Sequence, residues 1–288
     1  MNQIALGLAD GTAFFIGIGL LLASVTTTIF SKSRLAQSSA NIGCLVSLVV
    51  VLLSATPLPA WEYVLLCVFT AGFLLYINQF RNRKHSRRLR AIFAAGVVVV
   101  SIAVAVQESL NQLSPVFTMS AHTRIYVVGD SISAGMGRDT VLWPPLLSDM
   151  TGLSVSNLAL PGANVQSAQE QIAKIPNIPS VVILEIGGND LLGPSSSEQF
   201  RKGLESILDR LHQGRHHILM VELPLYPFKN AFGEAQRDLA RKYGVTLIPK
   251  RYFTKILGTE GATLDGLHLS PAGHKLFAET IAGILIVR

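Results

Sequence analysis

The sequence predicts four transmembrane helices followed by an α/β domain of three layers with a parallel sheet, and three observations lead to this prediction. Up to about residue 107, the chain contains four long stretches with almost no charged residue. Beyond about residue 122, short runs rich in Val, Ile and Leu alternate with segments of helical periodicity, as in α/β folds. Polar segments that contain glycine follow several of these apolar runs.

Each uncharged stretch is close to the roughly 17–25 residues that a helix needs to cross a bilayer. One such stretch is also compatible with a buried core helix, but four in succession favour membrane spans. Residues 1–10 contain no Lys or Arg, so the first stretch lacks the basic region that precedes a cleaved signal peptide. We expect four retained transmembrane helices, over about residues 11–31, 41–59, 63–80 and 91–107.

The basic residues of this half fall in two loops that alternating spans place on the same side of the membrane. They are Lys32, Arg34, Arg81, Arg83, Lys84, Arg87, Arg88 and Arg90. Short loops rich in Lys and Arg face the cytoplasm. We therefore predict an integral protein of the inner (cytoplasmic) membrane, with its N-terminus and its second domain on the non-cytoplasmic (periplasmic or extracellular) side.

The charge and the cysteines exclude several classes of site in the second domain. The formal net charge of +6 comes mostly from the basic loops, and the second domain has no basic stripe suited to nucleic acid. Cys44 and Cys67 both fall within predicted spans, so the second domain has no thiol for a disulfide. Cysteine spacing offers no metal site either.

The second domain is expected over residues 123–288, after a short polar linker at residues 108–122. Its predicted strands are apolar on both faces, as in a parallel sheet covered on both sides, and lie at residues 124–128, 155–160, 181–186, 217–223 and 245–248. The predicted helices lie at residues 141–150, 164–174, 196–213, 230–243 and 271–286. This alternation predicts three layers around one core.

Four polar segments occur at strand ends or in the loop before the last helix. They are GDSISAG at 129–135, LALPGAN at 158–164, EIGGND at 185–190 and DGLHLSPAGH at 265–274. Because ligands of open parallel sheets bind at the carboxyl ends of the strands, these segments are the places to look for chemistry.

The residue types in these segments suit nucleophilic catalysis by a serine. Ser131 is expected at a strand-to-helix turn, and His268 is a candidate base to accept the hydroxyl proton. Asp265, three residues earlier, can orient the imidazole. The Gly162 backbone N–H and the Asn189 amide can stabilise an oxyanion. Each segment taken alone is also compatible with an ordinary turn or loop.

Taken together and in this order, the four segments resemble blocks I, II, III and V of the SGNH hydrolases, the GDSL-type esterases and lipases. The family letters fall on Ser131, Gly162, Asn189 and His268, and the resemblance covers about residues 122–288. It implies the flavodoxin-like three-layer α/β fold. Ile132 replaces the Leu of the GDSL motif, which is a conservative apolar change.

The resemblance also implies the roles of the site residues. Ser131 attacks an ester carbonyl, His268 acts as base and then as acid, and Asp265 orients His268. The oxyanion hole consists of the Ser131 and Gly162 backbone N–H groups and the Asn189 side chain. An acyl-enzyme forms and is hydrolysed, and no metal or organic cofactor is needed.

Other polar residues are expected to have structural roles. Asp130 and Glu185 are interpreted as supporting residues, and His274 as a surface or helix-start histidine. A solvated loop accounts better than a metal site for His216 and His217, with His212 nearby. Whether Trp143 lines the site is left open.

Two substrate classes agree with a hydrolase held close to a membrane: acyl esters of lipids, as in thioesterase/lysophospholipase-like members, and acetyl groups on envelope glycans. The expected partners are the ester substrate and membrane lipids; the sequence does not predict a protein partner. Two alternatives to hydrolysis are acyl transfer onto envelope glycans and a non-enzymatic envelope protein with a relict site.

Overall fold

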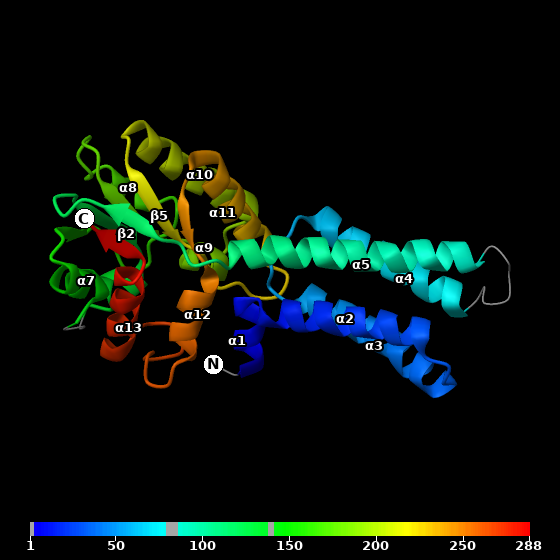
Figure 1. Cartoon of the computed structure of the whole chain (residues 1–288). Coiled ribbons are helices and arrows are strands. Elements are labelled where there is room, and N and C mark those ends of the chain that lie inside the picture. Colours follow the sequence, from blue (N-terminus) through cyan, green and yellow to red (C-terminus); the bar gives the residue numbers. More distant parts are fainter. Residues whose placement is uncertain (1–2, 79–85, 138–140) are drawn as a thin grey trace. The chain divides into compact units, whose positions relative to one another are not determined.

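A computed structural model describes residues 3–78, 86–137 and 141–288 of the chain (Figure 1). The chain forms two compact units. The helical unit comprises Gly7–Gln112 together with Tyr226–Asn230. The α/β unit comprises Leu113–Leu225 and Ala231–Arg288, together with the first residues of the chain.

The first part of the chain is entirely helical between short connections. Its helices are α1 (Gln3–Asp10), α2 (Thr12–Phe30), α3 (Arg34–Leu53), α4 (Ala60–Asn78) and α5 (Ser86–Asn111). Four of them, α2 to α5, are long and apolar enough to cross a membrane. Residues 79–80 of the third predicted span, and Arg81, Arg83 and Lys84 of the second basic loop, lie outside the described residues.

Several helix boundaries differ from those expected: α3 begins at Arg34 and not near residue 41, and α5 begins at Ser86 and not near residue 91. Helix α3 ends at Leu53 and not near residue 59, because Ser54 is extended and two prolines follow, at positions 57 and 59. Helix α5 continues to Asn111, four residues beyond the predicted span. Part of the segment expected as a linker is therefore helical.

Glycines allow the long helices to approach closely. Gly72 of α4 packs against the ring of Phe93 on α5, and Gly96 of α5 packs against the ring of Phe69 on α4, so neither has room for a Cβ. Large apolar side chains lie on the outside of these helices as well as between them. This distribution is typical of helices packed by small residues in a lipid environment.

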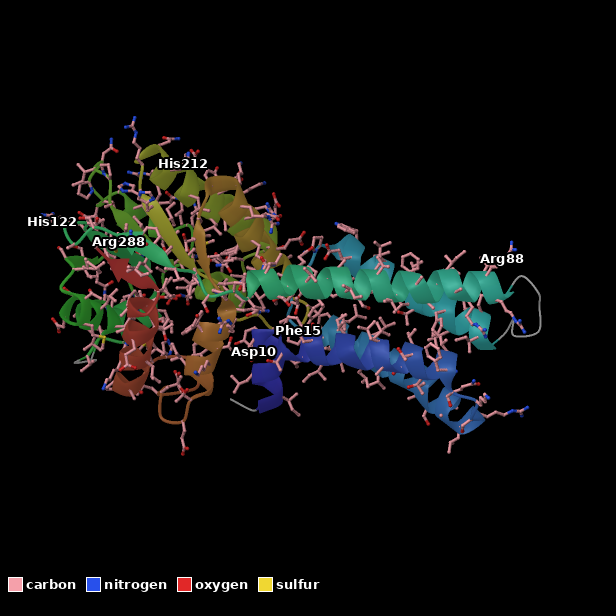
Figure 2. The ribbon with its side chains drawn as sticks, viewed as in Figure 1. Asp10, Phe15, Arg88, His122, His212 and Arg288 are labelled. Carbon is pink, nitrogen blue, oxygen red and sulfur yellow. The ribbon has the colours of Figure 1, made fainter. Side chains whose placement is uncertain are left out.

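The ends of this helix bundle differ in charge. Figure 2 shows Asp10, which precedes α2, and Arg88, in the first turn of α5, at opposite ends of the bundle. Lys32 and Arg34 lie at the connection between α2 and α3, so two groups of basic residues mark helix ends.

The α/β unit is built on five parallel strands in the order β3-β2-β4-β5-β6. The strands are β2 (Ile125–Gly129), β3 (Val155–Asn157), β4 (Val181–Glu185), β5 (His217–Val221) and β6 (Thr246–Ile248). All residues of β2 and β4 are buried, which explains why these strands are almost continuously apolar. The predicted parallel α/β fold with flanking helices is confirmed.

Helices cover both faces of this sheet (Figure 1). One face packs against α7 (Trp143–Thr151), α12 (Lys250–Gly258) and α13 (Pro271–Ala282), which share one apolar core with the sheet. On the other face, α8 (Ala168–Ile172) contacts β2 and α10 (Ser197–Gln213), and the Phe200 ring of α10 lies 5.1 Å from the Phe232 ring of α11 (Asn230–Tyr243).

Local signals set the ends of the longest helices. Ser196 caps α10 by accepting a hydrogen bond from the Gln199 backbone N–H, and the Gln199 side chain accepts one from the Ser196 N–H, which completes a capping box. Ser270 caps α13, and Pro271 occupies the first turn, where no backbone N–H is needed.

Several short elements were missed or misjudged from the sequence. A separate parallel pair, β1 (Phe117–Met119) with β7 (Leu285–Val287), uses residues expected in the linker and in the last helix. The last helix ends at Ala282 because the chain changes direction at Gly283 and then forms β7. The short helices α1, α6 (Ser131–Ala134), α9 (Gly188–Leu192) and α12 were not predicted as elements.

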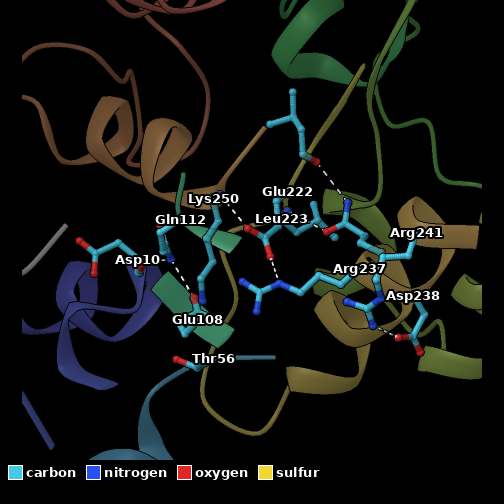
Figure 3. A network of polar contacts seen from close by, with 12 residues as sticks. Asp10, Thr56, Glu108, Gln112, Glu222, Leu223, Arg237, Asp238, Arg241 and Lys250 are labelled. Atoms are coloured by element: carbon cyan, nitrogen blue, oxygen red, sulfur yellow. Dashed lines mark hydrogen bonds and ion pairs between the residues drawn. The ribbon is translucent and has the colours of Figure 1, made fainter. Parts of the chain in front are cut away.

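A buried ion pair joins the end of β5 to α11 and α12 (Figure 3). Glu222 Oε1 accepts a hydrogen bond from Arg237 Nε at 2.7 Å, and Glu222 Oε2 accepts one from the Lys250 backbone N–H at 2.9 Å. Both side chains of the ion pair are almost fully buried. Hydrogen bonds to both oxygens offset part of the cost of burying the carboxylate.

Replacing Arg237 by Met is expected to destabilise the α/β unit by about 3–5 kcal/mol, because Glu222 would keep a buried charge without its partner. Urea unfolding of the full chain in detergent, followed by Trp143 fluorescence in a Trp61→Phe background, measures this unit. The exposed pair of Arg241 with Asp238 supplies the control: Arg241→Met should cost less than about 1 kcal/mol. If Arg237→Met and Arg241→Met lowered the free energy of unfolding equally, burial of the Glu222–Arg237 pair would not account for the loss.

Candidate active site

The order of the strands places two of the polar segments side by side. The chain passes from β2 to β3 on one side, then back across β2 to β4 on the other. Ligands in such sheets bind where this reversal occurs, beyond the carboxyl ends of the strands. Gly129, at the end of β2, pairs with Glu185, at the end of β4, so segments 129–135 and 185–190 begin next to each other.

The segment 129–135 forms a tight strand-to-helix turn. Asp130 follows β2 and caps α6: its Oδ1 accepts a hydrogen bond from the Ile132 backbone N–H at 3.0 Å. Within α6, Ile132 and Ser133 are buried, whereas Ser131 is partly exposed. The turn therefore presents Ser131 toward the surface and anchors the residues after it in the core.

Asn189 connects three of the four segments. It lies in α9, which begins after Gly187, a residue with φ +114° packed so closely against Phe200 that a Cβ would not fit. The Asn189 Nδ2 donates to the Ala163 carbonyl oxygen at 2.8 Å and to Asp130 Oδ2 at 3.2 Å. The amide thus lies between the residue before Ser131 and the residue after Gly162.

Gly162 is exposed and has φ +76°, a left-handed conformation that favours glycine. No other atom lies near the place where a Cβ would be. Gly162 therefore has space on its Cβ side, and its role as an oxyanion-hole donor stays a prediction.

Asp265 and His268 form a closely bonded pair within one short loop. His268 Nδ1 lies 2.7 Å from Asp265 Oδ2, while Asp265 Oδ1 accepts hydrogen bonds from the His268 and Leu267 backbone N–H groups at 2.8 and 3.0 Å. These hydrogen bonds lower the pKa of Asp265 to about 2, and the hydrogen bond with the His268 ring has the largest effect. The aspartate is therefore ionised at neutral pH. Because Asp265 occupies Nδ1 of His268, Nε2 is the ring nitrogen that can exchange a proton with other groups.

An electrostatic interaction links His268 to Asp130, the residue before Ser131. Burial raises the pKa of Asp130 to about 6, and both the Ile132 N–H and the charge of His268 lower it. Among the described residues, however, no hydrogen bond joins the Ser131 hydroxyl to His268. Catalytic hydrogen bonds commonly tighten only when substrate binds, so this geometry is compatible with proton transfer from Ser131.

Glu185 was interpreted as a supporting residue, but its partners in a buried support under the turn were not found from the sequence. The Ser133 hydroxyl donates to Glu185 Oε2 at 2.8 Å and accepts from the Trp143 indole N–H at 3.1 Å. The Gln171 amide bonds to both the N–H and the C=O of Gly129, at 2.9 Å each. Nothing in the spacing of Ser133, Trp143 or Gln171 indicates these contacts, since they join segments distant in the sequence.

The structure shows the surroundings of His274, expected as a surface or helix-start histidine, and of Trp143; His274 does lie in the first turn of α13. His274 is not a surface histidine: it is only 1% exposed, and its Nδ1 accepts a hydrogen bond from the Trp143 backbone N–H at 3.3 Å. It lies on the face of α13 that packs against α7, where it satisfies an N–H at the start of α7. Trp143 is fully buried and supports the turn without lining an open surface.

The remaining histidines lie away from the segments that carry Ser131 and Asn189. His216 and His217 are at the start of β5, the opposite end of the sheet, and His216 Nδ1 lies 2.8 Å from the Ser180 hydroxyl. The His212 ring contacts Tyr243. Within the described ranges, no group of three or more His, Cys, Asp or Glu side chains is arranged to hold a metal ion.

Comparison with known proteins identifies the family. Residues 127–276, more than half of the chain, match the family described as GDSL-like Lipase/Acylhydrolase. The chain belongs to this family. The matched residues include all four polar segments, so the chain is an SGNH-type carboxylic ester hydrolase.

Curated relatives carry names of the same kind. The chain is 26% identical over 179 residues to the "Thioesterase 1/protease 1/lysophospholipase L1" of Escherichia coli (strain K12), covering 58% of this chain and 85% of that protein. It is 25% identical over 182 residues to an "Arylesterase" of Vibrio mimicus, covering 58% and 90%.

Solved structures agree on the fold. The psychrotrophic esterase EstA from Pseudoalteromonas sp., inhibited by monoethylphosphonate, aligns with a TM-score of 0.51 at 17% identity, over 56% of this chain and 95% of that one. This likeness concerns the fold alone.

Proposed function

We propose that the protein is a membrane-anchored serine esterase that acts through an acyl-enzyme on the non-cytoplasmic side of the membrane. The observation that carries the catalytic part is the Asn189 amide, which bridges Asp130 and Ala163 and so gathers the Ser131, Gly162 and Asn189 segments at one place. The bonded Asp265–His268 pair supplies an oriented base.

In the proposed reaction, Ser131 Oγ attacks the ester carbonyl carbon while His268 Nε2 takes the hydroxyl proton. The negative charge on the carbonyl oxygen is stabilised by the Ser131 and Gly162 backbone N–H groups and the Asn189 amide. The C–O bond then breaks as His268 returns the proton to the leaving alcohol. A water molecule, deprotonated by His268, hydrolyses the acyl-enzyme and regenerates Ser131.

Asp265 serves this cycle by holding His268 and by remaining ionised. Its low pKa keeps the carboxylate negative when the imidazole becomes positively charged. The three hydrogen bonds that it accepts within its own loop fix the ring orientation without help from other elements.

Ser131→Ala is expected to lower kcat at least ~10³-fold and to abolish labelling by a fluorophosphonate, because it removes the oxygen that attacks in the proposed mechanism. Ester hydrolysis and labelling of the full chain in detergent measure this. Ser154→Ala, a change at an exposed serine next to β3, should leave both unchanged. Labelling that persists in Ser131→Ala would refute Ser131 as the nucleophile.

For the substrate, we propose an ester with an apolar acyl chain. One exposed large apolar side chain lies within each segment of the site or within two residues of its end: Met136, Leu160, Leu192 and Leu264. These residues lie within a few positions of Ser131, Gly162, Asn189 and Asp265, respectively. A hydrocarbon chain would gain free energy by covering such side chains, about 0.8 kcal/mol per buried methylene, whereas an acetyl group has too little surface to do so.

Rates on p-nitrophenyl esters of increasing chain length test this proposal. We expect kcat/KM to rise from the acetyl to the octanoyl ester, and Leu160→Ser together with Leu264→Ser to flatten that rise. Ile178→Ser, an equally exposed aliphatic residue before β4, is the control and should preserve it. A rate that peaks at acetyl would favour acetylated glycans as substrates and contradict the proposal.

For the membrane part, we propose that residues 1–107 anchor the catalytic domain, residues 123–288, outside the cytoplasm. The basic residues at the α2–α3 connection and at the start of α5 support this orientation, because loops rich in Lys and Arg remain in the cytoplasm. The opposite ends of these helices, at Asp10 and beyond Glu108, would then lie outside.

Single cysteines in a background lacking Cys44 and Cys67 test the orientation. A membrane-impermeant maleimide should label His122→Cys in intact cells, whereas Ser33→Cys, in the α2–α3 connection, should react only after lysis. Both residues are exposed, so accessibility within the fold does not differ. The reverse pattern would overturn the proposed sidedness.

A further inference from the structure

The Glu185 carboxyl lies directly beneath the turn that carries Ser131. Glu185 ends β4, is 4% exposed, and pairs in register with Gly129. A Cβ on Gly129 would meet Ser133 Oγ at 2.8 Å and Glu185 Oε2 at 3.0 Å, besides the Glu185 carbonyl oxygen at 2.7 Å. Only a glycine therefore allows the carboxyl and the turn to pack this closely.

One hydrogen-bonded chain runs from α7 through the turn to the sheet. The Trp143 indole N–H donates to the Ser133 hydroxyl, and that hydroxyl donates to Glu185. All three side chains are buried. In this series of hydrogen bonds each group donates to the next, and Glu185 is the final acceptor. The orientation of the Ser133 hydroxyl therefore depends on Glu185.

The turn is fixed on both sides of Ser131. Before it, the Gln171 amide holds the Gly129 backbone. After it, the Asn157 amide donates to the Ser133 carbonyl oxygen at 2.8 Å, and Glu185 holds the Ser133 side chain. Among the described residues, no hydrogen bond holds the Ser131 hydroxyl, so its position follows from these neighbours and from the Gly135 N–H bond to the Ser131 carbonyl oxygen.

We propose that Glu185 is a positioning residue for the nucleophile: by holding the Ser133 hydroxyl, it keeps Ser131 at the distance and angle required for attack. The inference rests on the proposed role of Ser131. A misplacement of about 1 Å at a reacting group can cost on the order of 10²-fold in rate, so a contact of this kind is large enough to matter.

Burial favours the neutral form of the Glu185 carboxyl, which can still accept the Ser133 hydrogen bond. Burial, and next the Asp130 carboxylate, raise the pKa of Glu185 well above its ordinary range, while the Ser133 hydrogen bond lowers it. Beyond Asp130 lie Asp190 and His268, and His274 lies behind Trp143. With Glu185 neutral, Asp130 is the carboxylate of the turn that interacts with His268, in addition to the hydrogen-bonded Asp265.

Three variants of the full chain in detergent test the inference. Glu185→Met keeps the volume but removes the acceptor, and Ser133→Ala removes the donor; each is expected to lower kcat by about 10- to 100-fold with KM changed less than about threefold. Glu185→Gln restores a neutral acceptor and should recover kcat to within about threefold of wild type. Ser180→Ala is the control: this serine is equally buried and hydrogen-bonded to His216, but at the opposite end of β4.

Because Glu185 and Ser133 act through one contact, the double variant Glu185→Met/Ser133→Ala should be no slower than the worse single variant. The rate of fluorophosphonate labelling should fall in parallel with kcat. Additive losses, or a kcat in Ser133→Ala equal to that of Ser180→Ala, would overturn the inference. If Glu185→Met fails to fold, Ser133→Ala alone decides, since it removes only one oxygen.

Thermal stability at different pH values tests the protonation state. A carboxyl whose pKa is raised in the folded protein contributes stability below about pH 4, and this contribution is lost as the pH rises. The Tm of wild type should therefore fall relative to that of Glu185→Gln as the pH rises from about 4. A wild-type Tm that stays constant or rises relative to that of Glu185→Gln as the pH rises would contradict a neutral Glu185.

These outcomes are separate from those that test the proposed function. Labelling that survives in Ser131→Ala would remove the nucleophile itself. Labelling that depends on Ser131 but proceeds at the wild-type rate in both Glu185→Met and Ser133→Ala would leave the esterase mechanism intact and refute only the positioning role.

Discussion

The site depends on the close approach of two parallel strands at their carboxyl ends, where Gly129 faces Glu185. Because Gly129 has no side chain, the chain can turn immediately after β2 and set Ser131 beside the Asn189 segment. The same approach buries a carboxyl under the turn, where it must be neutral or strongly hydrogen-bonded. One steric constraint thus fixes the position of the turn and the electrostatic character of the residues around it.

Much of the fold and the main site residues could be predicted because their signals are local. Apolar runs such as residues 181–185 identify central strands, and the Asp265–His268 spacing within one loop permits the bond that is observed. What could not be predicted depends on contacts between distant segments. His274 looked like a surface residue because only its packing against α7 shows that it accepts the Trp143 N–H.

The three-residue strands illustrate the same limit. Residues 285–287 continue the apolar periodicity of α13, so the sequence does not separate them from the helix. Their pairing with residues 117–119, more than 160 positions earlier, ends the helix and orders a segment that is otherwise polar and linker-like. A strand of this length is stabilised by its partner and not by its own propensity, which is why sequence periodicity does not show it.

The two hydrogen bonds of the Asn189 amide have a consequence for how the proposed enzyme would treat its substrate. In the structure, Nδ2 already donates to the Ala163 carbonyl and to Asp130. A neutral ester carbonyl would have to replace one of these acceptors and would gain little net binding free energy. An alkoxide oxygen is a much stronger acceptor and would profit from the exchange. The occupied amide therefore favours the charged intermediate over the bound ester, and such selectivity raises kcat without tightening the binding of substrate.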